Sequence, residues 1–85
     1  MKVTLNFTRI PTPEAAHEYL KSALALPEYY GKNLDALYDV LSTWDRPMAF
    51  SLRLPDSGDM GAWCSRMQRV FADAAQANSR IRLVK

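Results

Sequence analysis

The chain has 85 residues, enough for one small domain with a modest core, since a chain of this length buries only somewhat more than about 60% of its unfolded surface. An apolar content of 48% and a charged content of 24% exclude a mostly disordered chain, and a net charge of +2 is too weak to indicate a nucleic-acid-binding protein. We therefore expect a single domain over residues 1–85.

Cysteine usage and hydropathy predict the compartment. The single cysteine, Cys64, has no partner for an internal disulfide, which fits a reducing compartment. No apolar run approaches the roughly 18 residues of a membrane span, and no signal-peptide pattern follows Lys2. We expect a cytoplasmic protein that does not bind membranes.

The chain begins with a predicted strand over residues 2–7, where apolar side chains alternate with polar ones. A helix is predicted next, over residues 13–24, with Thr12 as its cap and Pro13 at its first position. Pro27 is expected to stop this helix, because the residue before a proline is pushed away from helical angles. His17 lies on the polar-leaning side of the helix, and we expect it at the surface.

A second helix is predicted over residues 34–43. Gly31 marks a turn where a side chain would be awkward, and Asn33 is a good helix N-cap. The helical projection places one apolar group on a single side: Leu34, Leu37, Leu41 and Trp44. The opposite side carries Asp35, Asp39 and Ser42, with Tyr38 at the boundary.

The second half of the chain predicts a strand over 48–54, a helix over 59–76 and a strand over 80–84. Ser57 or Asp59 is a candidate cap for this helix, and Cys64 is expected to be a small core residue. The order is therefore βααβαβ. Strands joined by helical crossovers pair in parallel, so we predict an α/β fold in which three main helices cover one face of a three-stranded parallel sheet.

The sequence argues against catalysis. His17 is the only histidine, no histidines or cysteines have metal-ligand spacing, and there is no phosphate loop. We expect no enzyme activity, no cofactor and no metal. Asp35 and Asp39 are paired carboxylates four residues apart, for which a solvated helix face is the simplest interpretation.

Aromatic side chains beside these acids favour a binding surface instead. Tyr29 and Tyr30 follow a proline in a turn; we expect Tyr29 to be exposed, whereas Tyr30 either joins it or packs over the core. Exposed tyrosines are typical binding anchors. Carboxylates among them suit a basic, concave partner site, in which they can replace phosphate.

Residues 26–41 read Leu-Pro-Glu-Tyr-Tyr-Gly-Lys-Asn-Leu-Asp-Ala-Leu-Tyr-Asp-Val-Leu. This segment closely resembles the central segment of the barstar family, inhibitors of the ribonuclease barnase, and weaker similarity spans essentially the whole chain. The resemblance implies a barstar-like fold. It also implies an intracellular inhibitor of a small secreted microbial ribonuclease that occludes RNA from the active site in a 1:1 complex.

The resemblance further implies roles for individual residues. Asp39 would enter the phosphate-binding site of the nuclease, Tyr29 would pack against its catalytic histidine, and Asp35 would pair with basic groups at the mouth of the site. The surrounding contact surface would comprise Tyr30, Gly31, Asn33, Tyr38, Ser42, Thr43, Trp44 and Asp73.

The chain departs from the family pattern mainly in charge. Barstar is acidic as a whole, whereas this chain carries +2, and Lys32 and Arg46 add positive charge within residues 26–46. Four acidic and two basic residues still leave −2 in that segment, which favours a basic target. Tyr38 stands in place of a tryptophan, and Asp73 in place of a glutamate.

Two alternatives remain at the level of the sequence. The first is a nucleic-acid-binding module that uses Arg66, Arg69, Arg80 and Arg82, although we expect these arginines to be a solvated face and direct nucleic-acid binding to be absent. The second is a barstar-like fold reused to bind a protein other than a nuclease.

Overall fold

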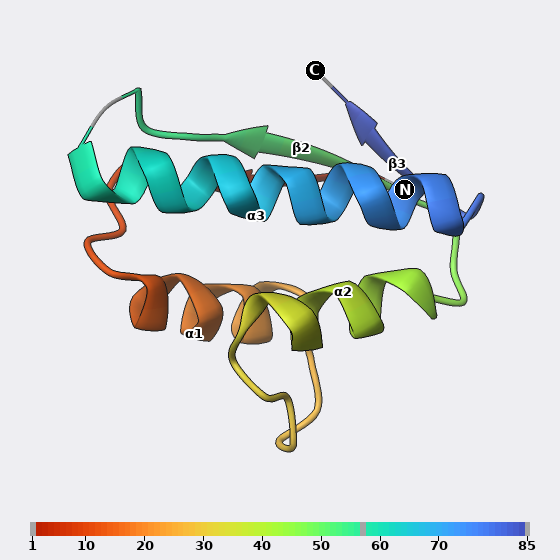
Figure 1. Cartoon of the computed structure of the whole chain (residues 1–85). Helices are drawn as coiled ribbons and strands as arrows, with labels where there is room; N and C mark the ends of the chain where they lie inside the picture. The colour runs from red at the N-terminus through yellow and green to blue at the C-terminus, as the bar shows by residue number, and fades with distance from the viewer. Residues whose placement is uncertain (1, 57, 85) are drawn as a thin grey trace.

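The computed structural model describes residues 2–56 and 58–84. Its elements, in chain order, are β1 (Lys2–Asn6), α1 (Pro13–Ala23), α2 (Leu34–Ser42), β2 (Met48–Arg53), α3 (Gly58–Ala77) and β3 (Ile81–Val84) (Figure 1). The predicted order βααβαβ is confirmed, and every predicted boundary lies within one residue of the observed one.

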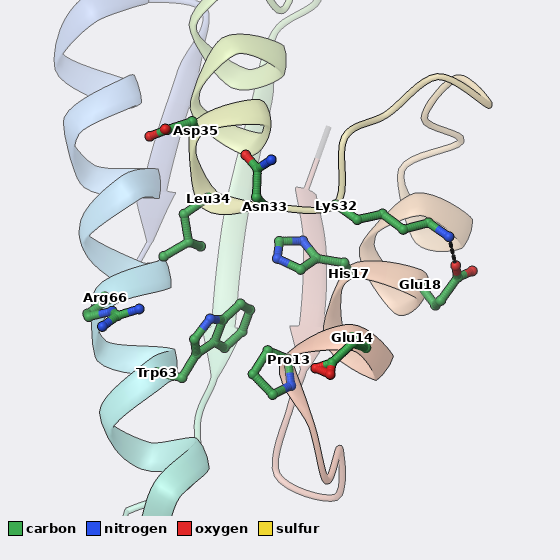
Figure 2. Close-up of a pocket in the computed structure, with 10 residues that line it drawn as sticks. All are labelled: Pro13, Glu14, His17, Glu18, Lys32, Asn33, Leu34, Asp35, Trp63 and Arg66. Carbon is green, nitrogen blue, oxygen red and sulfur yellow. Dashed lines mark ion pairs between the residues drawn. The ribbon is translucent and has the colours of Figure 1, made fainter.

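The sheet is parallel throughout, with β2 between β1 and β3. Val3, Phe50 and Leu83 lie side by side across the three strands and pack into the core. Because side chains alternate between the faces of a strand, the next row, Lys2, Ala49 and Arg82, lies on the other face. The strands lie behind all three helices in Figure 2, so the helices cover one face of the sheet, as predicted.

The core is built on aromatic contacts between β2 and the helices. The rings of Phe50 and Phe71 meet edge to face with centroids 5.2 Å apart, and Trp44 packs against Phe50 at 6.3 Å. Burying one such side chain contributes about 1.5–3 kcal/mol, so these contacts fix α3 and the end of α2 on the sheet. Cys64 is fully buried in α3, which confirms its predicted place in the core.

The ends of α1 show one predicted and one unpredicted feature. The Thr12 hydroxyl accepts a hydrogen bond from the backbone N–H of Ala15 at 3.1 Å, as expected for the cap. At the other end, Ala25 takes a left-handed conformation (φ 51°), and the N–H of Leu26 reaches back to the carbonyl of Lys21 at 2.9 Å. This Schellman-type ending stops the helix before Pro27 is reached, because it turns the chain away from the helix axis.

The start of α3 tests one of the two candidate caps. Asp59 lies inside the first turn of the helix rather than at the cap, where its negative charge suits the positive end of the helix dipole. Ser57 lies outside the described residues.

In the described part of the chain, no helix combines the length and the apolar character needed to cross a membrane.

Candidate functional site

The loop between α1 and α2, residues 24–33, is shaped by a turn and two unusual backbone positions. The backbone N–H of Tyr30 donates to the carbonyl of Pro27 at 3.0 Å. A Cβ added to Gly31 would lie 3.2 Å from the Cβ of Ala36, a tight contact that agrees with the prediction that a side chain would be awkward there. Besides Ala25, the left-handed residue of this loop is Lys32 (φ 54°), whereas Gly31 is not left-handed. In Figure 1 this loop extends away from α3 and the sheet.

Asn33 joins the loop to α2. Its side-chain oxygen accepts from the backbone N–H of Ala36 at 2.7 Å, which confirms it as the N-cap, and its amide nitrogen donates to the carbonyl of Gly31 at 3.3 Å. Asp35 in the first turn places negative charge at the positive end of the helix. The start of α2 is therefore fixed by local polar contacts.

The division of α2 into an apolar and an acidic side is confirmed. Leu37 and Leu41 are fully buried, Leu34 is partly buried, and both Asp35 and Asp39 are exposed. In the described residues neither aspartate forms an ion pair with another side chain of the chain. Their charge is therefore available to an outside group.

Tyr29 and Asp39 border a shallow hollow of about 510 Å³. The hollow is lined by Pro27, Tyr29, Asp39, Val40, Thr43, Trp44, Asp45 and Arg46. The Tyr29 side chain is 88% exposed, which confirms its predicted exposure. The Arg46 guanidinium lies 5.1 Å from the centroid of the Trp44 ring, so this positive charge borders the same hollow as Asp39.

Hydroxyl and amide groups hold the C-terminal end of α2. The hydroxyls of Ser42 and Thr43 donate to the backbone carbonyl of Asp39 at 3.2 and 2.8 Å. The buried side-chain amide of Asn78 donates to the carbonyls of Leu41 at 3.0 Å and Trp44 at 2.8 Å. Nothing in the local sequence signals these long-range partners of Asn78.

A second hollow, of about 570 Å³, lies between α1, α3 and the start of α2 (Figure 2). Asn33 and Asp35 line it together with residues of both helices: Pro13, Glu14, His17, Glu18, Lys32, Leu34, Trp63 and Arg66. The acids of α2 are thus divided, with Asp35 beside this hollow and Asp39 beside the first.

The prediction that His17 is a surface histidine is wrong. Its side chain is 3% exposed, its Nδ1 lies 2.8 Å from the Tyr30 hydroxyl, and the Trp63 ring stands edge-on to it at 5.3 Å. Burial lowers the pKa of His17, an effect that the nearby Glu14 opposes in part. The sequence around His17 in α1 contains polar residues, which led to the prediction of a surface position. The ring is covered by Tyr30 of the loop and Trp63 of α3, and the pattern of α1 alone does not indicate these contacts.

The contact with His17 decides between the two predicted positions of Tyr30, exposed beside Tyr29 or packed over the core. Its side chain is buried, and burial raises the pKa of its hydroxyl to about 12. Tyr30 therefore packs over the core while Tyr29 stays outside.

Trp44 is also largely buried, at 9% exposure, and its ring N–H has no hydrogen-bond partner in the described residues.

Two ion pairs join α1 to the loop. Lys32 pairs with Glu18, as the dashed line in Figure 2 shows, and Lys21 pairs with Glu28 at 3.0 Å. The hydrogen bond from Lys32 is the main cause of the lowered pKa of Glu18. The unexpected positive charge of Lys32 is thus partly neutralised within the chain.

Tyr38 and Asp73, also predicted to contact the partner, do not line the hollow that Tyr29 and Asp39 share. Tyr38 is 36% exposed on α2. Asp73 lies on α3, where its carboxylate is 3.6 Å from the guanidinium of Arg69. The four arginines of the nucleic-acid alternative are all exposed, but Arg66 borders the second hollow whereas Arg80 and Arg82 border another, beside Ala49 of the sheet.

No metal site is visible across residues 2–56 and 58–84, since no three histidine, cysteine or acidic side chains are grouped to hold an ion. The chemistry that this surface offers is that of exposed carboxylates, a phenol ring and backbone groups. Such a set suits recognition of a basic partner.

Comparison with known proteins shows the family of the chain. The protein of Bacillus subtilis (strain 168) named "Putative ribonuclease inhibitor YrdF" is 49% identical to this chain over 41 residues. The match covers 47% of this chain and 45% of that relative, so it spans less than half of the relative's length. The sequence profile described as "Barstar (barnase inhibitor)" matches residues 1–83, and the chain therefore belongs to the barstar family.

Proposed function

We propose that this protein inhibits a small secreted microbial ribonuclease by occupying its active site in a 1:1 complex. It acts in the cytoplasm of the cell that makes the nuclease and has no enzyme activity of its own. Membership of the family of barnase inhibitors supports the inhibitory role, as does the name of the Bacillus relative.

The observation that carries the proposal is the hollow bordered by Tyr29 and Asp39. Both side chains are exposed, and Asp39 has no ion-pair partner within the described residues. Ribonucleases bind phosphate with basic side chains, and a carboxylate on a rigid helix can replace phosphate there. Asp39 would fill the phosphate site while the Tyr29 ring covers the catalytic groups, so RNA is excluded.

The remaining contacts divide into those that touch the nuclease and those that support them. Asp35 would meet basic groups at the rim of the nuclease site, and further contacts would come from Gly31, Asn33, Tyr38, Ser42, Thr43 and Asp73. Tyr30 and Trp44 are buried, so they would act mainly by supporting Tyr29 and the end of α2 from below.

The test is a titration of a panel of small microbial ribonucleases, with barnase among them, read by residual RNA cleavage. Wild-type protein should abolish the activity of at least one nuclease at one equivalent. Asp39→Ala should weaken that inhibition by about 3–5 kcal/mol, the usual cost of removing one partner of a buried charge pair. Tyr29→Ala should also weaken it, because a central aromatic anchor is lost.

Asp59→Ala is the matched control, because Asp59 is also an exposed helical aspartate but lies on α3, outside both hollows that flank α2. It should inhibit like the wild type. Asp39→Ala should keep its unfolding free energy within about 0.5 kcal/mol of the wild type, since the side chain is exposed. Tight inhibition by both Asp39→Ala and Tyr29→Ala would show that the assigned surface is wrong.

A further inference from the structure

Three side chains of α1 each contact a different residue of the loop 24–33. His17 meets Tyr30, Glu18 meets Lys32, and Lys21 meets Glu28. We propose that these contacts, called the α1 clamp below, position the loop so that Tyr29 is held ready for its partner. The inference rests on the proposed function, because it gives α1 a role in partner binding without any contact with the partner.

The geometry of the clamp is what suggests positioning. The three α1 residues lie within about one helical turn, so they present one side of the helix to the loop. Their loop partners, residues 28, 30 and 32, flank Tyr29 on both sides, and Tyr29 itself remains 88% exposed. The loop is thus attached on either side of the one ring that it exposes.

The three contacts differ in strength. The contact between His17 and Tyr30 is buried, where a hydrogen bond is worth more and a lost partner costs more. In the other two pairs at least one partner is exposed, and such ion pairs contribute little. The Tyr30 hydroxyl is therefore expected to be the main attachment, with the two ion pairs as secondary ones.

Positioning matters here because the loop is not a regular element. Its internal hydrogen bonds are the turn bond from Tyr30 N–H to the Pro27 carbonyl and the longer bond from the Asn33 side chain to the Gly31 carbonyl. Lys32 holds a left-handed backbone that lysine rarely adopts. A loop that is ordered before binding does not lose conformational freedom when the partner arrives. The clamp therefore raises affinity through the orientation of Tyr29.

The first test is a double-mutant cycle measured as inhibition of the ribonuclease that the panel identifies. Tyr30→Phe removes the clamp hydroxyl and keeps the ring. In this background Tyr29→Ala should lose less affinity than in the wild type, by a coupling of about fivefold. The loss caused by Asp39→Ala should be the same in both backgrounds, since α2 is held by its own leucines. An equal loss from Tyr29→Ala in both backgrounds would overturn the clamp.

Tyr19→Phe is the matched control for Tyr30→Phe. The Tyr19 hydroxyl also makes one hydrogen bond from α1, but it accepts from the backbone N–H of Asn6, in β1, at 3.1 Å. Its removal should leave the cost of Tyr29→Ala unchanged. A coupling as large as that of Tyr30→Phe would mean that any lost tyrosine hydroxyl loosens the fold, and the positioning role would be rejected.

The second test uses the free protein and needs no nuclease. Amide hydrogen exchange at Tyr30, whose N–H bonds Pro27, should be about fivefold faster in Tyr30→Phe than in the wild type. Exchange at Phe50 in the core sheet serves as the internal reference for global unfolding. Unchanged exchange at Tyr30 would refute the clamp even if the protein inhibits. Faster exchange with no inhibition of any nuclease would refute the proposed function alone.

Discussion

A buried histidine destabilises a small protein unless its ring is partnered and stays neutral. His17 meets the first condition through the Tyr30 hydroxyl and the edge of the Trp63 ring. It meets the second because burial lowers its pKa below the ordinary 6.5. At the scale of single residues, the burial of His17 is the largest difference between the structure and the sequence-based prediction.

The lowered pKa of His17 predicts a pH dependence of stability. The unfolded chain binds a proton at His17 near pH 6.5, whereas the folded chain binds it only at lower pH. The free energy of unfolding should therefore fall as the pH drops below about 6.5, by at most about 1.4 kcal/mol per pH unit from this group. Urea unfolding between about pH 8 and pH 5.5, where carboxylates stay largely ionised, measures the slope.

His17→Gln provides the control, because His17 is the only histidine of the chain and glutamine does not titrate. The variant should lose most of the slope between these pH values. If wild type and variant show the same slope, another group is responsible and His17 is not held neutral by burial.

Side-chain placement on α2 could be predicted because it follows from periodicity alone. Leu37 and Leu41 are inside, and Asp35 and Asp39 are outside, as a period of 3.6 residues requires. His17 could not be predicted in this way, since residues distant in sequence cover it. The left-handed Ala25 was missed for another reason, because glycine or asparagine is the usual signal for that conformation.

At the scale of elements, α2 is held at its two ends in different ways. Its start is fixed locally by the Asn33 cap, which the sequence predicts. Its end is fixed by Asn78, which follows α3 and reaches the carbonyls of Leu41 and Trp44. The helices and strands were predictable from local patterns, whereas this link between α2 and the end of α3 depends on the tertiary fold.

Asn78→Ala should destabilise the protein by about 2–4 kcal/mol, because it removes three hydrogen bonds of the Asn78 side chain: two that it donates to the carbonyls of Leu41 and Trp44, and one that it accepts from the N–H of Arg80. The measurement is the free energy of unfolding in urea. Gln76→Ala, an exposed change at the end of the same helix, should stay within about 0.5 kcal/mol of the wild type. A cost below about 1 kcal/mol for Asn78→Ala would mean that α2 does not need this attachment.

At the scale of the whole molecule, two surfaces differ in the sign of their net charge. Segment 26–46 carries four acidic residues against Lys32 and Arg46, a net charge of −2, whereas the sheet face turned away from the helices carries Lys2 and Arg82 in one row. A basic nuclease should therefore approach from the side of the loop and α2, even though the chain as a whole is slightly positive. Contact with an acidic partner would favour the sheet face instead.

Amide chemical-shift mapping tests the central claim most directly. Isotope-labelled protein is titrated with a catalytically inactive form of the ribonuclease that it inhibits, and the shifted amides are located on the fold. The largest changes should fall in residues 29–44 and saturate at one equivalent. Changes centred on Lys2, Ala49 and Arg82, with residues 29–44 unaffected, would contradict inhibition through the surface of Tyr29 and Asp39.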